Sequence, residues 1–174
     1  MARMARLFVE DAAYHIVTRG SQNSDVFWDE DDFRFYLRLM YHYKVRYGCR
    51  FYCYCLMPNH THIVLDSPNG LKAMSSFMHG LSMTYAIYFV KKYDRAGHVW
   101  QNRYKSFVIL KDAYMLNALT YVEFNPVRAK IVLKPEDYPW SSYKGRVLGH
   151  NDSLLDEISL VGTGVNINLG TDVR

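Results

Sequence analysis

The segment RFYCYCLMPNHTHIVLD, which runs from Arg50 to Asp66, contains two runs of aromatic and β-branched residues on either side of Pro58 and Asn59. Aromatic and β-branched side chains favour β-strands, and a Pro-Asn pair favours a turn. We therefore predict strands at residues 50–57 and 60–66. Because so few residues separate the two strands, a β-hairpin is the expected geometry.

The segments on either side extend this hairpin into a longer series of elements. Short runs of aromatic and β-branched residues predict strands at 13–19 and 104–110. Apolar residues at helical spacing predict helices from 29–32 to Gly48, at 71–93 and from 113 to about 124. Acidic residues mark the start of the first helix and Gly48 its end, and Pro126 ends or kinks the last helix. The first six elements follow the order strand, helix, strand, strand, helix, strand, which is the split pattern of ferredoxin-like folds. The sequence therefore predicts an α+β fold, a ferredoxin-like antiparallel sheet with helices packed on one face, followed by a C-terminal helix.

Length and charge indicate one domain with a basic surface. A chain of 174 residues suits a single domain, which we place at residues 1–150, with a polar tail at 151–174 whose end is expected to be loose. Residues 1–150 carry 20 Lys and Arg against 13 Asp and Glu, and six of these bases lie between Lys91 and Lys111, where Asp94 is the sole acid. Such a stretch is typical of a surface that follows nucleic-acid phosphates, although a solvated helix end and loop would have the same composition.

The remaining composition favours a cytoplasmic protein. Residues 1–20 carry charges throughout, so we expect no signal peptide, and no apolar run approaches the ~20 residues that span a bilayer. Cys49, Cys53 and Cys55 crowd into one predicted strand, and their spacing predicts buried thiols on one face of it rather than a disulfide framework.

His60 and His62 are the first candidates for chemistry. Residues two apart on a strand project on the same side, so the strand presents two imidazoles together. Two neutral imidazoles are a workable start for a divalent-metal site that lacks one or two further ligands. A pair of ordinary strand histidines is the alternative, because an isolated His-x-His is common by chance.

Tyr121 and Asn125 are the second candidates. They are four residues apart and so share one face of the last predicted helix. Asn125 offers a carbonyl oxygen as a third metal ligand. Tyr121 offers a phenol, which is a weak nucleophile at neutral pH. A metal ion that polarises the target phosphate would make attack by this phenol easier. With 15 tyrosines in the chain, Tyr121 could instead be a core aromatic. Tyr114, one heptad earlier, competes for the same role, although Ala118 four residues on offers no ligand.

Five separated motifs make the chain resemble the REP-associated tyrosine transposases, members of the single-tyrosine HUH transposase superfamily (IS200-like). The resemblance covers roughly residues 6–143. It rests on YHIVTRG at 14–20, MPNHTH at 57–62, GHVWQNRYK at 97–105, YVEFNPVRA at 121–129 and YPWSSY at 138–143. Two small departures are Asn102 and Lys130, each at a position where we expect glycine.

The resemblance implies roles for particular residues. Tyr121 would be the nucleophile on the C-terminal helix, and it would leave a 5′-phosphotyrosine and a free 3′-hydroxyl. The ligands of a Mg²⁺ or Mn²⁺ ion would be His60, His62 and Asn125, the last where related transposases use a glutamine. Phosphates of the DNA would be held by Arg19, Arg103, Lys105 and Arg128.

The implied substrate is single-stranded DNA beside a hairpin, bound by a monomer or homodimer at the nucleoid. Two other functions are open at this point. One is a catalytically silent hairpin-DNA-binding protein of the same fold. The intact set of site residues argues against this reading. The other is a hydrolytic metalloenzyme built on His60 and His62, for which Asp66 is the nearest candidate third ligand.

Overall fold

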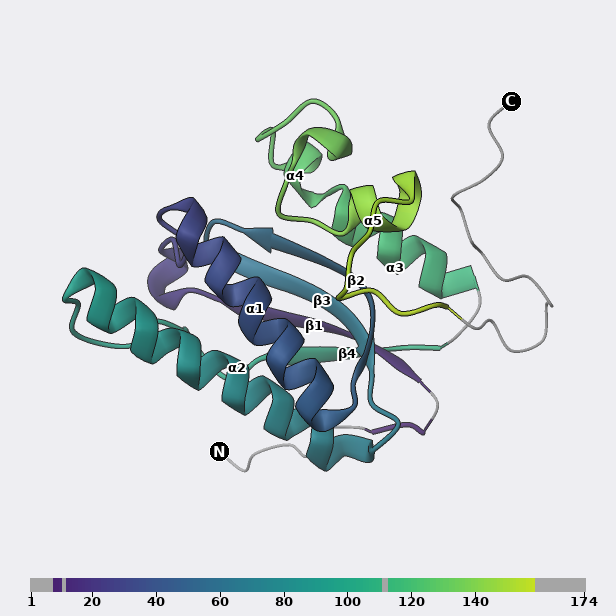
Figure 1. Cartoon of the computed structure of the whole chain (residues 1–174), viewed down its shortest axis with the longest axis horizontal. Helices are drawn as coiled ribbons and strands as arrows, with labels where there is room; N and C mark the ends of the chain where they lie inside the picture. Colours follow the sequence, from purple (N-terminus) through teal and green to yellow (C-terminus); the bar gives the residue numbers. More distant parts are fainter. Residues whose placement is uncertain (1–7, 11, 111–112, 159–174) are drawn as a thin grey trace.

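The computed structural model describes residues 8–10, 12–110 and 113–158, and its centre is a four-stranded sheet (Figure 1). The strands are β1 (Ala13–Arg19), β2 (Arg50–Met57), β3 (His60–Asp66) and β4 (Lys105–Ile109). They lie in the order β2-β3-β1-β4, and each neighbouring pair is antiparallel. This order and the predicted hairpin confirm the ferredoxin-like α+β prediction.

Two long helices cover one face of the sheet. α1 (Glu30–Tyr47) and α2 (Gly70–Tyr93) lie side by side in Figure 1, and their apolar side chains form one core with Tyr14, Ile16 and Ile63 of the sheet. α3 (Ala113–Glu123) packs on the other face, through Met115, Leu119 and Val122. The helix predicted after the last strand therefore closes a second, smaller core.

Short elements complete the described chain. They are η1 (Ser21–Asn23), α4 (Asn125–Arg128), η2 (Pro135–Asp137) and α5 (Tyr143–Leu148). The break between α3 and α4, with Pro126 in the first turn of α4, confirms the predicted effect of that proline. No helix in these described segments is long and apolar enough to cross a membrane.

The prediction that all three cysteines share one face of β2 is wrong for Cys49. The pairing of β2 with β3 shifts between Phe51 and Cys53, which leaves Tyr52 as an extra residue in a β-bulge. An extra residue reverses the alternation of side chains, because alternate residues of a strand point to opposite faces. Cys49 accordingly lies in the α1–α2 core, whereas Cys53 and Cys55 lie in the α3 core, and all three are buried as predicted.

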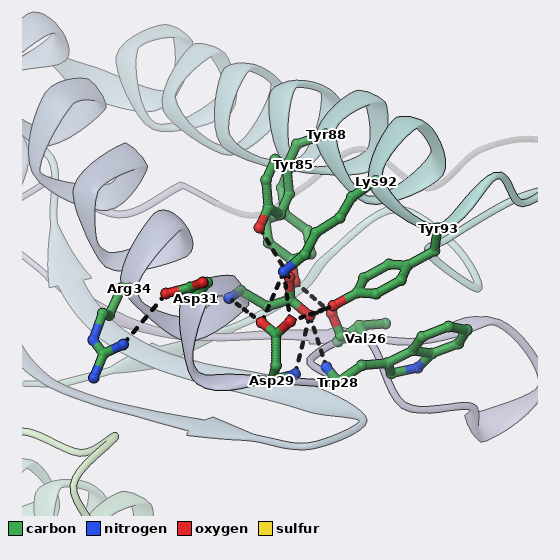
Figure 2. A network of polar contacts seen from close by, with 10 residues as sticks. Val26, Trp28, Asp29, Asp31, Arg34, Tyr85, Tyr88, Lys92 and Tyr93 are labelled. Carbon is green, nitrogen blue, oxygen red and sulfur yellow. Dashed lines mark hydrogen bonds and ion pairs between the residues drawn. The ribbon is translucent and has the colours of Figure 1, made fainter.

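A polar cluster joins the start of α1 to the end of α2 (Figure 2). Asp29 caps α1 in a reciprocal capping box with Asp32, which is fully buried. Lys92 of α2 binds both carboxylates, at 2.7 Å from Asp29 and 2.8 Å from Asp32. The Tyr88 and Tyr93 hydroxyls donate to Asp32 at 3.0 and 2.7 Å, so the buried carboxylate has several partners.

The segment after α5 packs against the edge strand β2. Leu154 is buried in the α1–α2 core, and the Asp156 carboxylate accepts a 2.7 Å hydrogen bond from the Phe51 backbone and pairs with Lys44 at 2.7 Å. The rest of the predicted polar tail, residues 159–174, lies outside the described residues.

Candidate active site

Two histidines of β3 stand side by side on the sheet face that α3 partly covers. His60 and His62 project on the same side as Val64, which belongs to the α3 core. Their ring centroids are 4.9 Å apart, with His60 half-buried and His62 buried. The predicted pairing of the two imidazoles is therefore present in the structure.

A third histidine, His15 of β1, touches this pair. Its Nε2 lies 2.8 Å from Nδ1 of His62, and the two rings stack at 5.0 Å. Sequence reasoning gave His15 no role. Two signals could have pointed to His15. The alternation of β1 puts it on the same face as Ala13 of the α3 core, and it lies in the YHIVTRG motif.

Burial keeps the imidazoles neutral. Burial, reinforced by the charge of Arg19, lowers the pKa of His60 to about 4. Burial and the neighbouring His60, His15 and Arg19 lower the pKa of His62 to about 3. Burial also lowers the pKa of His15. Neutral imidazole is the form that binds a metal ion.

The hydrogen bonds also determine which ring nitrogens are open. Nδ1 of His60 lies 2.6 Å from Oδ1 of Asn59, and the amide of Asn59 is oriented by a 3.3 Å hydrogen bond to the Asn23 carbonyl. Nδ1 of His60 is thus the donor, and its Nε2 keeps a lone pair. When Nδ1 of His62 donates to His15, Nε2 of His62 likewise keeps a lone pair.

Tyr121 lies on α3 beside these rings. Its ring stands edge-on to His15 at 6.0 Å and to His62 at 6.1 Å, and its side chain is 45% exposed, so Tyr121 is not a core aromatic. The Arg128 guanidinium lies over the Tyr121 ring at 4.6 Å and donates to the Tyr121 carbonyl at 2.9 Å. The competing Tyr114 is 71% exposed and has no ring contact to a histidine among the described residues.

Asn125 lies one turn beyond Tyr121, at the start of α4. Its amide nitrogen donates to the carbonyls of Tyr121 at 2.9 Å and Val122 at 3.2 Å, which leaves its Oδ1 open. Within the described residues no hydrogen bond joins Asn125 to His60 or His62. Tyr121 therefore contacts the histidine rings directly, whereas Asn125 lies near them because it is one helical turn from Tyr121.

Three of the four predicted DNA-binding cations lie around this face. Arg19 is paired across the sheet with His60, and Lys105 is paired with Val17, which is itself opposite His62. Arg128 lies on Tyr121, as described above. Arg103 is exposed and instead lines a cavity of about 570 Å³ between α2 and residues 98–104.

The hydrolase alternative finds no support in this geometry. Asp66 is buried and already bound by Arg50, at 2.9 and 2.7 Å, and by the Tyr52 hydroxyl at 2.6 Å. No group of three or more His, Cys, Asp or Glu side chains within the described segments is arranged to hold a metal ion. A site at His60 and His62 would need an oxygen ligand of another kind.

Together, the fold and the site define a ferredoxin-like protein with a neutral histidine pair beside an exposed tyrosine and a cation. The family model "Transposase IS200 like" matches residues 8–125, and the chain belongs to that family. A Haemophilus influenzae protein described as a "Putative REP-associated tyrosine transposase" is 26% identical over 99 residues, which are 51% of this chain and 56% of that protein. The chain thus matches little more than half the length of this relative.

A solved structure shares the fold over nearly the whole length of both chains. It is a REP-associated tyrosine transposase bound to a REP hairpin, with a TM-score of 0.71, 16% identity, and coverage of 100% of this chain and 99% of that one. At this identity the likeness establishes the α+β fold.

Proposed function

We propose that the chain is a DNA transposase and single-strand endonuclease that cleaves and rejoins single-stranded DNA next to hairpins through a 5′-phosphotyrosine on Tyr121. The observation that carries the proposal is the position of Tyr121. An exposed phenol lies against His62 and His15, with Arg128 over its ring. A nucleophile, a metal-binding pair and a phosphate-binding cation are the groups that such a reaction needs.

The chemical step follows from these groups. The Tyr121 oxygen attacks the scissile phosphorus, and the bond from phosphorus to the 3′ oxygen of the preceding nucleotide breaks. The phenol loses one proton and the departing 3′ oxygen gains one, so that a free 3′-hydroxyl remains. Arg128 and Arg19 offset the charge of the phosphate on either side of the histidines. Attack by a 3′-hydroxyl on the phosphotyrosine reverses the step and rejoins a strand.

The donor atoms fit a divalent cation. His60 and His62 each offer Nε2, and Asn125 offers Oδ1 from the adjacent helix end. This set of nitrogen and oxygen donors suits Mn²⁺, and it suits Mg²⁺ less closely because Mg²⁺ prefers oxygen. When bound, the ion would polarise the scissile phosphate and neutralise its charge.

The proposed partner is hairpin-bearing single-stranded DNA. The structural neighbour of the same fold is bound to a REP hairpin. On this chain, Arg19, Lys105 and Arg128 place positive charge around the histidine face, as binding to phosphates requires. The protein would act in the cytoplasm, where its DNA lies.

The test is formation of a covalent adduct. Labelled single-stranded hairpin oligonucleotides, taken from genomic repeats beside the gene, are incubated with protein and Mn²⁺ or Mg²⁺ and resolved under denaturing conditions. We expect an adduct that disappears in Tyr121→Phe and in EDTA. Tyr114→Phe is the matched control and should form the adduct normally.

Other outcomes would replace this proposal. Cleavage without adduct in both wild type and Tyr121→Phe would indicate a hydrolase. Tight binding without adduct or cleavage on every substrate would indicate a hairpin-binding protein of the same fold.

A further inference from the structure

The sheet face that carries the histidines is only partly covered by α3. Ala13 and Ile109 lie beneath α3 in its core, whereas Lys105 and Phe107, on the same face of β4, are exposed. β4 is an edge strand of the sheet. Among the described residues, the part of this face that α3 leaves uncovered therefore runs from the histidines to the edge strand β4.

Phe107 is the large apolar side chain of this open part, with 54% of its surface exposed. It is paired across the sheet with His15, and the two ring centroids are 6.1 Å apart. His15 is in turn 6.0 Å from the Tyr121 ring. Phe107, His15 and Tyr121 thus form a row of three rings that ends at the candidate nucleophile.

The surroundings of Phe107 distinguish it from an ordinary exposed apolar residue, which alone needs no explanation. Lys105 lies two residues before it on the same face and is exposed. Alternating cations and exposed aromatic rings are the arrangement by which proteins bind single-stranded nucleic acid, since every base has a face that can stack. Buried core packing cannot be the main role of a ring that is more than half exposed.

We propose that Phe107 stacks on a base of the single-stranded substrate close to the scissile phosphate, while Lys105 binds a phosphate of the same segment. This inference rests on the proposed function and adds a base-binding platform to it. Because stacking tolerates any base, the platform positions the strand at Tyr121 without fixing the sequence. Sequence preference would come from other contacts.

The test uses Tyr121→Phe protein, which keeps the platform but forms no adduct. Hairpin oligonucleotides carry the fluorescent base 2-aminopurine at successive positions around the cleavage site. Stacking on Phe107 should quench the fluorescence at one or two adjacent positions. Phe107→Ala should abolish that quenching and weaken binding about tenfold, as expected for loss of one stacked base.

Two further variants separate stacking from fold and from general hydrophobicity. Phe107→Trp should keep the quenching and the affinity, whereas Phe107→Leu, which retains apolar surface without a flat ring, should lose both. The matched control is Leu110→Ala, which removes a 62% exposed apolar side chain that follows the same strand and should behave like the parent protein. Circular dichroism melting checks that each variant is folded.

The outcomes distinguish this inference from the proposed function. Equal quenching and affinity in folded Phe107→Ala, Phe107→Leu and parent protein would overturn the platform, even if wild type forms the adduct. Quenching that depends on Phe107, in a protein whose wild type forms no adduct, would support the platform and overturn the nuclease.

Discussion

At the scale of single residues, His15 has the clearest role that the sequence did not reveal. Its Nε2 lies 2.8 Å from Nδ1 of His62, and this contact leaves Nε2 of His62 free for the metal ion that we propose. Partners that orient a metal ligand typically change metal affinity 10- to 100-fold when they are removed.

We therefore expect His15→Phe to weaken Mn²⁺ binding at least about tenfold, since phenylalanine keeps the ring contact but cannot accept the hydrogen bond. His15→Gln retains an acceptor and should lose less. Electron paramagnetic resonance of free Mn²⁺ measures the affinity without reference to DNA cleavage. Unchanged affinity in His15→Phe would show that His15 has no part in orienting His62.

The lowered pKa of His62, to about 3, makes a second prediction at this scale. In the unfolded chain an imidazole gains a proton near pH 6.5, whereas His62 in the folded chain stays neutral to about pH 3. The unfolded state therefore binds more protons as the pH falls between these values, and the folded state loses stability by up to about 1.4 kcal/mol per pH unit.

Urea unfolding in EDTA at pH 7, 6 and 5 tests this. The free energy of unfolding should fall toward pH 5 in wild type and fall less steeply in His62→Gln. Parallel pH profiles of the two proteins would rule out a buried neutral His62.

These residues also show what sequence can predict at this scale. His60 and His62 were found because strand alternation is local. His15 was missed because its contact with His62 depends on β1 pairing with β3, 47 positions apart, which no local pattern specifies. Cys49 was placed on the wrong face because regular strand alternation does not include the bulge at Tyr52, which becomes visible only in the pairing of β2 with β3.

At the scale of elements, the position of α3 determines where Tyr121 lies. Glu123, the last residue of α3, is fully buried, and both of its carboxylate oxygens bind the Arg146 guanidinium of α5. The Ser142 hydroxyl adds a 2.7 Å hydrogen bond to the same carboxylate. The helix that contains Glu123 was predictable from periodicity and from Pro126, whereas α5 was not predicted. The link between the two helices was not predictable either, because Glu123 reads as an ordinary helix-end residue.

Removing one partner of a buried pair leaves an uncompensated charge, which typically costs about 3–5 kcal/mol. We expect Arg146→Met to lower the free energy of unfolding by about that amount. Because α3 carries Tyr121, the same substitution should also reduce the yield of the adduct if it displaces α3. The double variant Glu123→Met with Arg146→Met should recover a large part of the loss, because no unpaired charge remains.

The matched control is the exposed pair Arg34–Glu30, whose side chains are 53% and 69% exposed. Glu30→Gln should cost less than about 1 kcal/mol. Denaturant unfolding measures the free energy of unfolding of the wild type, Arg146→Met, the double variant and Glu30→Gln. If Arg146→Met costs no more than Glu30→Gln, the buried pair does not anchor α3.

At the scale of the whole molecule, the packed body continues beyond α5. Leu154 is only 4% exposed in the α1–α2 core, although it lies in a stretch whose polar composition predicts a tail. Composition could not reveal this, because two leucines among polar neighbours do not show which part of the core they contact.

Leu154→Ala should therefore lower the free energy of unfolding by about 2–5 kcal/mol, the usual cost of truncating a buried leucine. Leu148→Ala, at a 49% exposed leucine of α5, is the control and should cost much less. Equal effects of the two substitutions would show that the segment around Leu154 does not contribute to the folded core.

The arrangement of the whole chain also predicts where each catalytic group comes from. α3 packs on the sheet of its own chain, so Tyr121 lies 6.1 Å from the ring of His62 in the same molecule. A single chain thus contains both the proposed nucleophile and the histidine pair, and catalysis should occur in cis. We expect that mixing Tyr121→Phe with His62→Ala yields no adduct, because neither chain has both groups. Adduct formation by the mixture, at a yield that rises with protein concentration, would show instead that two copies exchange α3.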